Sequence, residues 1–163
     1  MRAVWQPAYI GLGSNLSDPA AQVRQALHDL AGVARTLRVA VSPLYGSRPL
    51  GPVTQPDFVN AVAGVLTQLT AAQLLQALRA LEGQAGRPAV HEHWGPRVID
   101  LDLLVFGREQ RSDADLVLPH PGVVARNFVL FPLADIAPEL EVPGQGQVRD
   151  LLARVSADGI WPL

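Results

Sequence analysis

The spacing of hydrophobic residues predicts two amphipathic helices, and each has a capping signal at its start. Asp18 fits an N-cap, and Pro19 then takes the first helical position, where proline is favoured. Thr70 and Gln73 fit a capping box, in which two side chains satisfy free amide groups. The apolar residues at helical spacing are Val23, Leu27 and Leu30 in the first helix and Leu74, Leu75, Leu78 and Leu81 in the second.

Four other apolar segments predict strands, and the resulting order is β-α-β-β-α-β. These segments cover residues 8–13, 37–45, 57–69 and 97–106. The order is typical of a ferredoxin-like fold, with an antiparallel sheet and both helices on one face. Additional helices are expected near residues 127–136 and 148–155, where they would cover the other face. We therefore expect an α+β fold with three layers, α/β/α, in a single domain over residues 1–163.

The composition supports a folded globular domain. Hydrophobic residues make up 48% of the chain and charged residues 17%. No apolar run approaches the roughly 18 to 20 residues of a membrane span, and the N-terminal segment lacks the features of a signal peptide. The chain has no cysteine, which excludes disulfides and thiolate chemistry. We expect a cytoplasmic protein that does not associate with membranes.

The charged residues exclude several classes of protein. The net charge of −2 argues against a broad nucleic-acid-binding surface. All 13 basic residues are arginine, so the chain has no lysine for a P-loop or for the third strand of a protein kinase. Any phosphate must therefore be held by arginine, backbone amides, helix ends or a metal ion.

Two aspartates on the last predicted strand suggest a metal site. Asp100 and Asp102 share one face of the strand, roughly 7 Å apart, since side chains alternate. A divalent cation would offset their repulsion, and magnesium combines one or two carboxylates with phosphate oxygens and water. Two aspartates at this spacing, without further context, are also compatible with an ordinary solvent-facing strand. The preceding turn at Gly95-Pro96 and the guanidinium of Arg97 favour phosphate chemistry beside a metal.

The run WGPRVIDLDLLVFG resembles the signature of the 6-hydroxymethyl-7,8-dihydropterin pyrophosphokinases of folate biosynthesis. Three other segments agree in order. YIGLGSN resembles the first strand and turn of that family, SRPLGPVTQPDFVNAV its pterin-binding loop and strand, and LPHPGVVARNFVLFPLADIAPEL its last conserved block. The resemblance runs from residue 9 to about residue 140, so it covers most of the chain.

The resemblance implies a reaction and its catalytic residues. ATP would donate its β,γ-pyrophosphate to the hydroxymethyl oxygen of the pterin and leave as AMP. Asp100 and Asp102 would bind two Mg²⁺ ions, while Arg87 and Arg97 would hold phosphates and stabilise developing charge. The implied partners are ATP and the pterin alone, and the implied state is a monomer.

The resemblance also assigns two binding regions. The nucleotide side would comprise Glu82, Arg87, Trp94, Arg97, Leu103, His120 and Arg126. The pterin side would comprise Ser47, Leu50, Phe58, Asn60, Trp94, Arg97 and Phe128. Within it, the two phenylalanines would stack on the ring, Asn60 would bind its polar edge, and Ser47 and Leu50 would offer backbone groups. Trp94 and Arg87 would lie on a loop that closes over the substrates.

Some residues depart from the family pattern. Phe58 stands where tyrosine is frequent, and Ala89 and Asp115 occupy positions that are often basic, which weakens the expected outer nucleotide contacts. His91 and His93 are interpreted as loop surface rather than as a metal site.

Two alternatives remain open from the residues themselves. The first is a non-catalytic ferredoxin-like module that senses a ligand or binds RNA, and an RNA-binding version would need exposed strand aromatics and a basic face. Another magnesium-dependent nucleotidyl transferase would share the aspartate pair without requiring Asn60 between aromatic residues.

Overall fold

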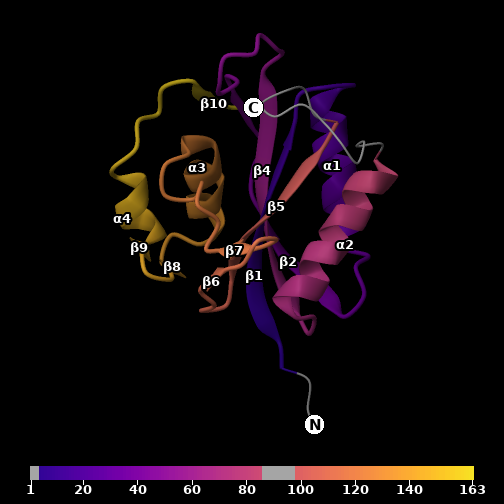
Figure 1. Cartoon of the computed structure of the whole chain (residues 1–163). Helices are drawn as coiled ribbons and strands as arrows, with labels where there is room; N and C mark the ends of the chain where they lie inside the picture. Colours follow the sequence, from indigo (N-terminus) through magenta and orange to yellow (C-terminus); the bar gives the residue numbers. More distant parts are fainter. Residues whose placement is uncertain (1–3, 86–97) are drawn as a thin grey trace.

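The computed structural model describes residues 4–85 and 98–163 (Figure 1). Its elements in chain order are β1 (Gln6–Ser14), α1 (Pro19–Leu30), β2 (Thr36–Val41), β3 (Tyr45–Ser47), β4 (Phe58–Thr67), α2 (Ala71–Gln84), β5 (Asp100–Phe106), β6 (Arg111–Ser112), β7 (Val117–Leu118), α3 (Asn127–Ile136), β8 (Glu141–Val142), β9 (Gly146–Gln147), α4 (Val148–Leu152) and β10 (Ile160–Pro162).

The main sheet has the strand order β10-β3-β4-β1-β5, and β2 also pairs with β4. Every pairing in it is antiparallel. The first predicted strand, the two helices and the last predicted strand therefore assemble in the ferredoxin-like arrangement that the element order predicts, with β1 between β4 and β5. The expectation of a ferredoxin-like α+β core is confirmed.

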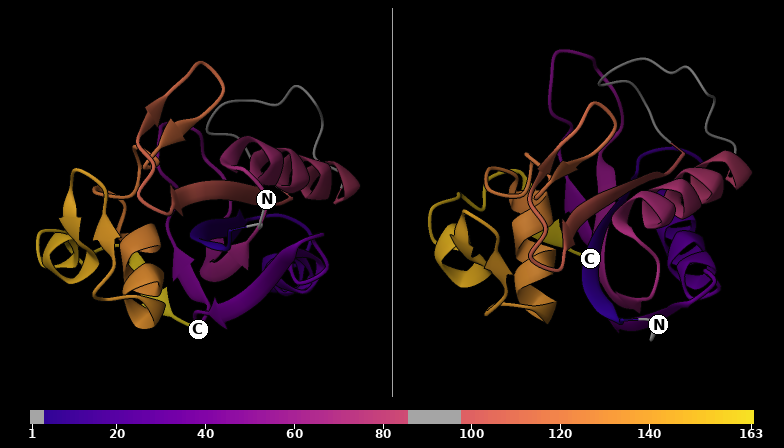
Figure 2. Two further views of the ribbon diagram at one scale, coloured as in Figure 1. Left: turned by 90° about the horizontal axis from the view of Figure 1, so that it is seen from below. Right: turned by 60° about the horizontal axis from the view of Figure 1, so that its bottom comes forward.

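Helices cover both faces of this sheet, as Figures 1 and 2 show from three directions. On one face, α1 and α2 bury Leu30, Leu74 and Leu78 against the strands. On the other face, α3 and α4 bury Leu130 and Leu151 with residues of β4 and β5. The three-layer prediction holds because alternate side chains of the central strands enter two separate hydrophobic clusters.

Both capping signals are present in the structure. The Asp18 side chain accepts a hydrogen bond from the Ala21 amide at 3.4 Å. The Thr70 hydroxyl accepts from the Gln73 amide at 3.2 Å, and the Gln73 side chain accepts from the Thr70 amide at 2.9 Å. The helices α1 and α2 therefore begin at the residues that the sequence indicated.

The single strand predicted over residues 37–45 is wrong, because the structure has two strands there. β2 ends at Val41 and β3 begins at Tyr45. Between them, Pro43 has no N–H for a ladder, and the Ser42 hydroxyl accepts the hydrogen bond of the Val62 amide at 2.9 Å. The break lets β4 pair with β2 along one half and with β3 along the other.

Several short elements were not predicted. The hairpins β6–β7 and β8–β9 and the last strand, β10, each have only two or three residues, too few to show a period. Within the described part of the chain, no helix is long and apolar enough to cross a membrane.

Candidate functional site

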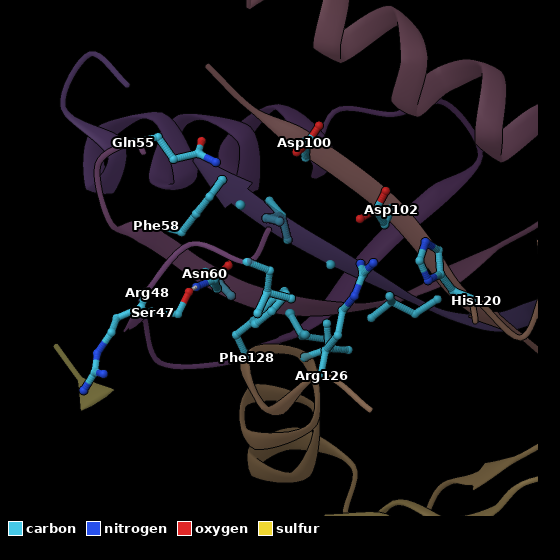
Figure 3. A pocket seen from close by; sticks show the side chains of 18 of the residues that line it. Ser47, Arg48, Gln55, Phe58, Asn60, Asp100, Asp102, His120, Arg126 and Phe128 are labelled. Atoms are coloured by element: carbon cyan, nitrogen blue, oxygen red, sulfur yellow. Dashed lines mark hydrogen bonds between the residues drawn. The ribbon is translucent and has the colours of Figure 1, made fainter. Parts of the chain in front are cut away.

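A cavity of about 310 Å³ opens between the sheet and the start of α3. This volume is at the lower end of the range for small-molecule sites. Its polar, charged and aromatic lining residues are Ser47, Arg48, Gln55, Phe58, Asn60, Arg79, Asp100, Asp102, His120, Arg126 and Phe128. All of these except Arg79 are labelled in Figure 3.

Asp100 and Asp102 lie on one face of β5 and line the cavity, as their spacing predicts. The residues opposite them on β1 are both glycines, Gly13 facing Asp100 and Gly11 facing Asp102. A Cβ at Gly13 would lie 3.3 Å from the side-chain oxygen of Asn60. The absence of side chains at these two positions keeps the floor of the cavity open between the carboxylates and Asn60.

Asn60 and Ser47 form a buried polar pair at another part of the cavity. Asn60 on β4 is 5% exposed and Ser47 on β3 is 2% exposed. The Asn60 side-chain amide donates to the Ser47 hydroxyl at 2.7 Å. Figure 3 shows Asn60 between Phe58 and Phe128, which come from β4 and α3. An amide edge beside two aromatic rings suits a flat heterocycle with hydrogen-bonding groups.

His120 and Arg126 line the cavity from the segment that leads into α3. The His120 Nδ1 accepts a hydrogen bond from the Gly122 amide at 2.9 Å, so we assign the ring proton to Nε2. Burial lowers the pKa of His120 to about 4, and the positive charges of Arg126 and Arg79 act in the same direction. His120 is therefore a neutral donor near pH 7.

Arg126 contributes positive charge to the same end of the cavity. Its guanidinium carbon lies 5.9 Å from the centroid of the Phe128 ring, within the range of a cation–π contact. Arg126 is also the N-cap residue of α3, and no side chain caps that helix end. Because a helix N-terminus and a guanidinium both attract anions, this end of the cavity suits a phosphate group.

The donor set fits a hard divalent cation that shares its ligands with a substrate. No group of three or more histidine, cysteine, aspartate or glutamate side chains suitable for a metal occurs within residues 4–85 and 98–163. Two carboxylates are nevertheless enough for Mg²⁺, which takes its other ligands from phosphate oxygens and water. Asp100 and Asp102 are the residues that could hold such an ion.

The structure brings most of the predicted residues that it describes to one place. Those that line the cavity are Ser47, Leu50, Phe58, Asn60, Asp100, Asp102, His120, Arg126 and Phe128. Predicted residues that lie outside the described part of the chain are Arg87, Trp94 and Arg97, together with Ala89, His91 and His93. The individual roles of all these residues stay predictions.

Two predicted nucleotide ligands, Glu82 and Leu103, are not among the residues that line the cavity. Leu103 is 2% exposed and packs in the hydrophobic cluster under α1 and α2, on the face of β5 opposite the aspartates. Only its backbone would be available to a nucleotide. Glu82 is 3% exposed and hydrogen-bonds to the backbone of β5.

Sequence reasoning missed three polar or charged lining residues, Arg48, Gln55 and Arg79. Gln55 accepts a hydrogen bond from the Asn15 side chain at 2.8 Å, which joins the loops after β1 and β3. Arg79 lies on α2 next to the apolar stripe, where an arginine is normally a solvated surface residue. The position of Gln55 within the pterin-loop resemblance was an available signal, whereas nothing in the sequence distinguishes Arg79.

Comparisons with known proteins show the family of the chain. Residues 9–138 match the model of the 7,8-dihydro-6-hydroxymethylpterin-pyrophosphokinase (HPPK) family. The chain is 47% identical over 156 residues to a 2-amino-4-hydroxy-6-hydroxymethyldihydropteridine pyrophosphokinase of Pseudomonas aeruginosa. This match covers 95% of each protein. Its identity to the Haemophilus influenzae protein of that name is 41% over 145 residues, covering 89% of this chain and 90% of the relative.

A solved structure supports the fold. A Plasmodium falciparum HPPK-DHPS variant with pterin and p-hydroxybenzoate is similar with a TM-score of 0.73 at 13% identity. The match covers 98% of this chain and 47% of the other, so this chain spans about half the length of that protein. At this identity the likeness concerns the fold alone.

Proposed function

Because this chain belongs to the 7,8-dihydro-6-hydroxymethylpterin-pyrophosphokinase family, we propose that its cavity binds ATP and the dihydropterin side by side. The protein is an ATP-dependent diphosphotransferase of folate biosynthesis. It transfers the β,γ-pyrophosphate of ATP to the hydroxymethyl group of 6-hydroxymethyl-7,8-dihydropterin and releases AMP. The alternatives of a non-catalytic binding module and of a nucleotidyl transferase are not favoured by this membership.

One observation supports the proposal above all: a carboxylate pair and a buried amide line the same cavity. Asp100 and Asp102 suit a metal-bound triphosphate, while Asn60 and Ser47 suit the polar edge of a pterin. The transfer requires the hydroxymethyl oxygen of one substrate to lie close to the β-phosphorus of the other. A single cavity with these two lining sets can hold both groups in that relation.

Asp100 and Asp102 would hold Mg²⁺, and two ions are proposed. Each ion would take further ligands from the triphosphate and from water. When bound, magnesium neutralises phosphate charge and so makes the β-phosphorus easier for the hydroxyl to attack. The aspartates also have a second effect, because their fixed negative charge excludes a triphosphate that arrives without its cation.

His120 and Arg126 would bind phosphate oxygens. Because His120 is neutral, it donates Nε2–H without adding charge, whereas Arg126 supplies a full positive charge. Developing charge on the leaving AMP oxygen would be stabilised at this end of the cavity. Arg87 and Arg97 are proposed to add further positive charge, and Trp94 a contact to both substrates.

Asn60, Ser47, Phe58 and Phe128 would orient the pterin. Asn60 already donates one N–H to Ser47, which leaves its carbonyl oxygen and its second N–H for the ligand. The Ser47 hydroxyl accepts from Asn60 and can still donate. The two phenylalanines would contact the ring faces and so fix the plane of the pterin. The Asn60 amide would limit rotation of the pterin within that plane. A monomer in the cytoplasm is proposed as the working form.

The reaction can be tested by incubating the protein with ATP, Mg²⁺ and 6-hydroxymethyl-7,8-dihydropterin and separating the nucleotides. AMP should form in equal amount to the pterin diphosphate. Formation of ADP, or no turnover, would contradict the proposal. Asp100→Asn should lower kcat by at least about a hundredfold, because a metal ligand is lost. Asp150→Asn changes an exposed aspartate of α4 and should leave turnover unchanged.

A further inference from the structure

Arg79 and Glu82 of α2 form an ion pair directly behind the aspartate strand. Their side-chain atoms Nη1 and Oε1 are 3.0 Å apart. The Arg79 side chain is 53% exposed, whereas that of Glu82 is 4% exposed. A carboxylate buried to this extent needs strong partners, since its desolvation is costly.

Glu82 finds its second partner on β5, at the residue between the two aspartates. Its Oε2 accepts a hydrogen bond from the Leu101 amide at 2.9 Å. The Leu101 carbonyl oxygen lies 3.5 Å from Arg79 Nη1, at the limit of a hydrogen bond. Both backbone groups of Leu101 therefore point towards side chains of α2.

This contact matters because β5 is the last strand at its end of the described sheet. In an antiparallel strand, backbone groups of successive residues point to opposite sides. Since the backbone groups of Leu101 point outwards, the backbone groups of Asp100 and Asp102 point towards β1, where these residues pair with Gly13 and Gly11. The ladder to β1 thus holds the aspartates from one side, and the Arg79–Glu82 pair takes the place of a neighbouring strand on the other.

Packing alone does not explain a glutamate at this position. Leu74, Leu78 and Glu82 are buried at successive four-residue intervals along α2. A leucine at position 82 would continue the apolar stripe without the cost of burying a charge. The carboxylate is instead used to satisfy the Leu101 amide, which an apolar side chain would leave without a partner.

We propose that Glu82 and Arg79 are positioning residues for pyrophosphoryl transfer, which fix the Leu101 backbone and thereby the spacing and direction of Asp100 and Asp102. The proposal rests on the proposed function, in which these aspartates hold the metal. An aspartate side chain has only two rotatable bonds, so the strand backbone largely decides where its carboxylate lies. A small rotation of the peptide units at Leu101 would move both carboxylates together.

The test compares Glu82→Ala with Glu82→Gln, whose amide oxygen can still accept from Leu101. The matched control is Glu139→Ala, which breaks an arginine ion pair of 3.1 Å whose carboxylate is exposed. The measured quantities are the hydrogen-exchange rate of the Leu101 amide by NMR, kcat, the Mn²⁺ affinity in the presence of a non-hydrolysable ATP analogue, and the Kd values of that analogue and of the pterin.

In Glu82→Ala we expect the exchange rate of the Leu101 amide to rise about tenfold or more. The Kd of Mn²⁺ should also rise about tenfold or more, and kcat should fall. Glu82→Gln should recover most of the metal affinity. The pterin Kd should change little in either variant, since Asn60 and Ser47 are on other strands. Glu139→Ala should match the wild type in every one of these measurements.

Two results would overturn the proposal. One is faster exchange at Leu101 with unchanged Mn²⁺ affinity and kcat. The other is an equal loss of nucleotide affinity in Glu82→Ala and Glu82→Gln with unchanged metal affinity, which would mean that Glu82 contacts the nucleotide directly. If Glu82→Ala does not fold, Glu82→Gln and Arg79→Met decide by the same measurements. Turnover of the wild type to AMP tests the proposed function separately, so the two failures are distinguishable.

Discussion

The side-chain amide of Asn60 donates a hydrogen bond of 2.7 Å to the hydroxyl of Ser47, and this bond joins β4 to β3 inside the cavity. The two residues also lie near each other in the strand register, where Asn60 is opposite Tyr45 and Ser47 is opposite Phe58. Each therefore depends on the other for its hydrogen bond and its orientation, since both are buried.

Ser47→Ala should weaken pterin binding although the backbone of residue 47 is kept. The variant leaves the Asn60 N–H without a partner, which costs about 1 to 3 kcal/mol, or about a 5- to 150-fold rise in the pterin Kd if the ligand depends on the same orientation. Fluorescence titration with the pterin measures this change. The Kd of the ATP analogue is the internal control. An equal loss for both ligands would show general damage rather than a pterin contact.

His120 should make the stability of the protein depend on pH in a defined window. Its pKa is lowered from 6.5 to about 4 in the folded state, so between these values the unfolded chain binds more protons there. The contribution of the neutral ring is complete above pH 6.5 and is lost as the pH falls towards 4. Unfolding in urea at about pH 5 and about pH 7.5 measures it.

His120→Asn should reduce the loss of stability between these two pH values, because asparagine does not titrate. Its side-chain oxygen can still accept a hydrogen bond from the Gly122 amide. His28→Asn changes an exposed histidine of α1 and serves as the matched control. A wild-type pH dependence in His120→Asn would contradict the assignment of a buried neutral ring.

Gly46→Ala should unfold at lower temperature than the wild type. A Cβ at Gly46 would lie 2.2 Å from the Trp161 side chain, so the tryptophan would have to leave the position where β10 pairs with β3. We expect a loss of about 1 to 3 kcal/mol. Pterin affinity should also fall, because Ser47 is next in the strand. Thermal unfolding by circular dichroism measures the first effect.

Gly83→Ala is the matched control for that substitution. Its Cβ would have no neighbour within 4 Å, and it lies inside α2. Alanine is the better helix former, so this variant should gain up to about 1 kcal/mol. If both glycine variants lost stability equally, the contact with Trp161 would not be the cause.

Local signals in the sequence were enough to place several elements of the fold. The starts of α1 and α2 follow from capping residues that lie within three positions of the amides they bind, and a helix was expected over the range of α3. The sharing of one face by Asp100 and Asp102 follows from the two-residue period of a strand. The assignment of the reaction came from ordered blocks of residues that resemble a family, not from periodicity.

The surroundings of those aspartates depend on contacts between distant parts of the chain. Asn60 of β4 and the segment that carries His120 and Arg126 into α3 are far apart in the sequence, and only the tertiary fold brings them to the same cavity. One partner of Glu82 is the Leu101 amide at the edge of β5, and the pairing of β10 with β3 joins residues more than a hundred positions apart. Local sequence patterns report neighbours within a few residues, whereas a site depends on long-range pairing and on which strand edge is left open.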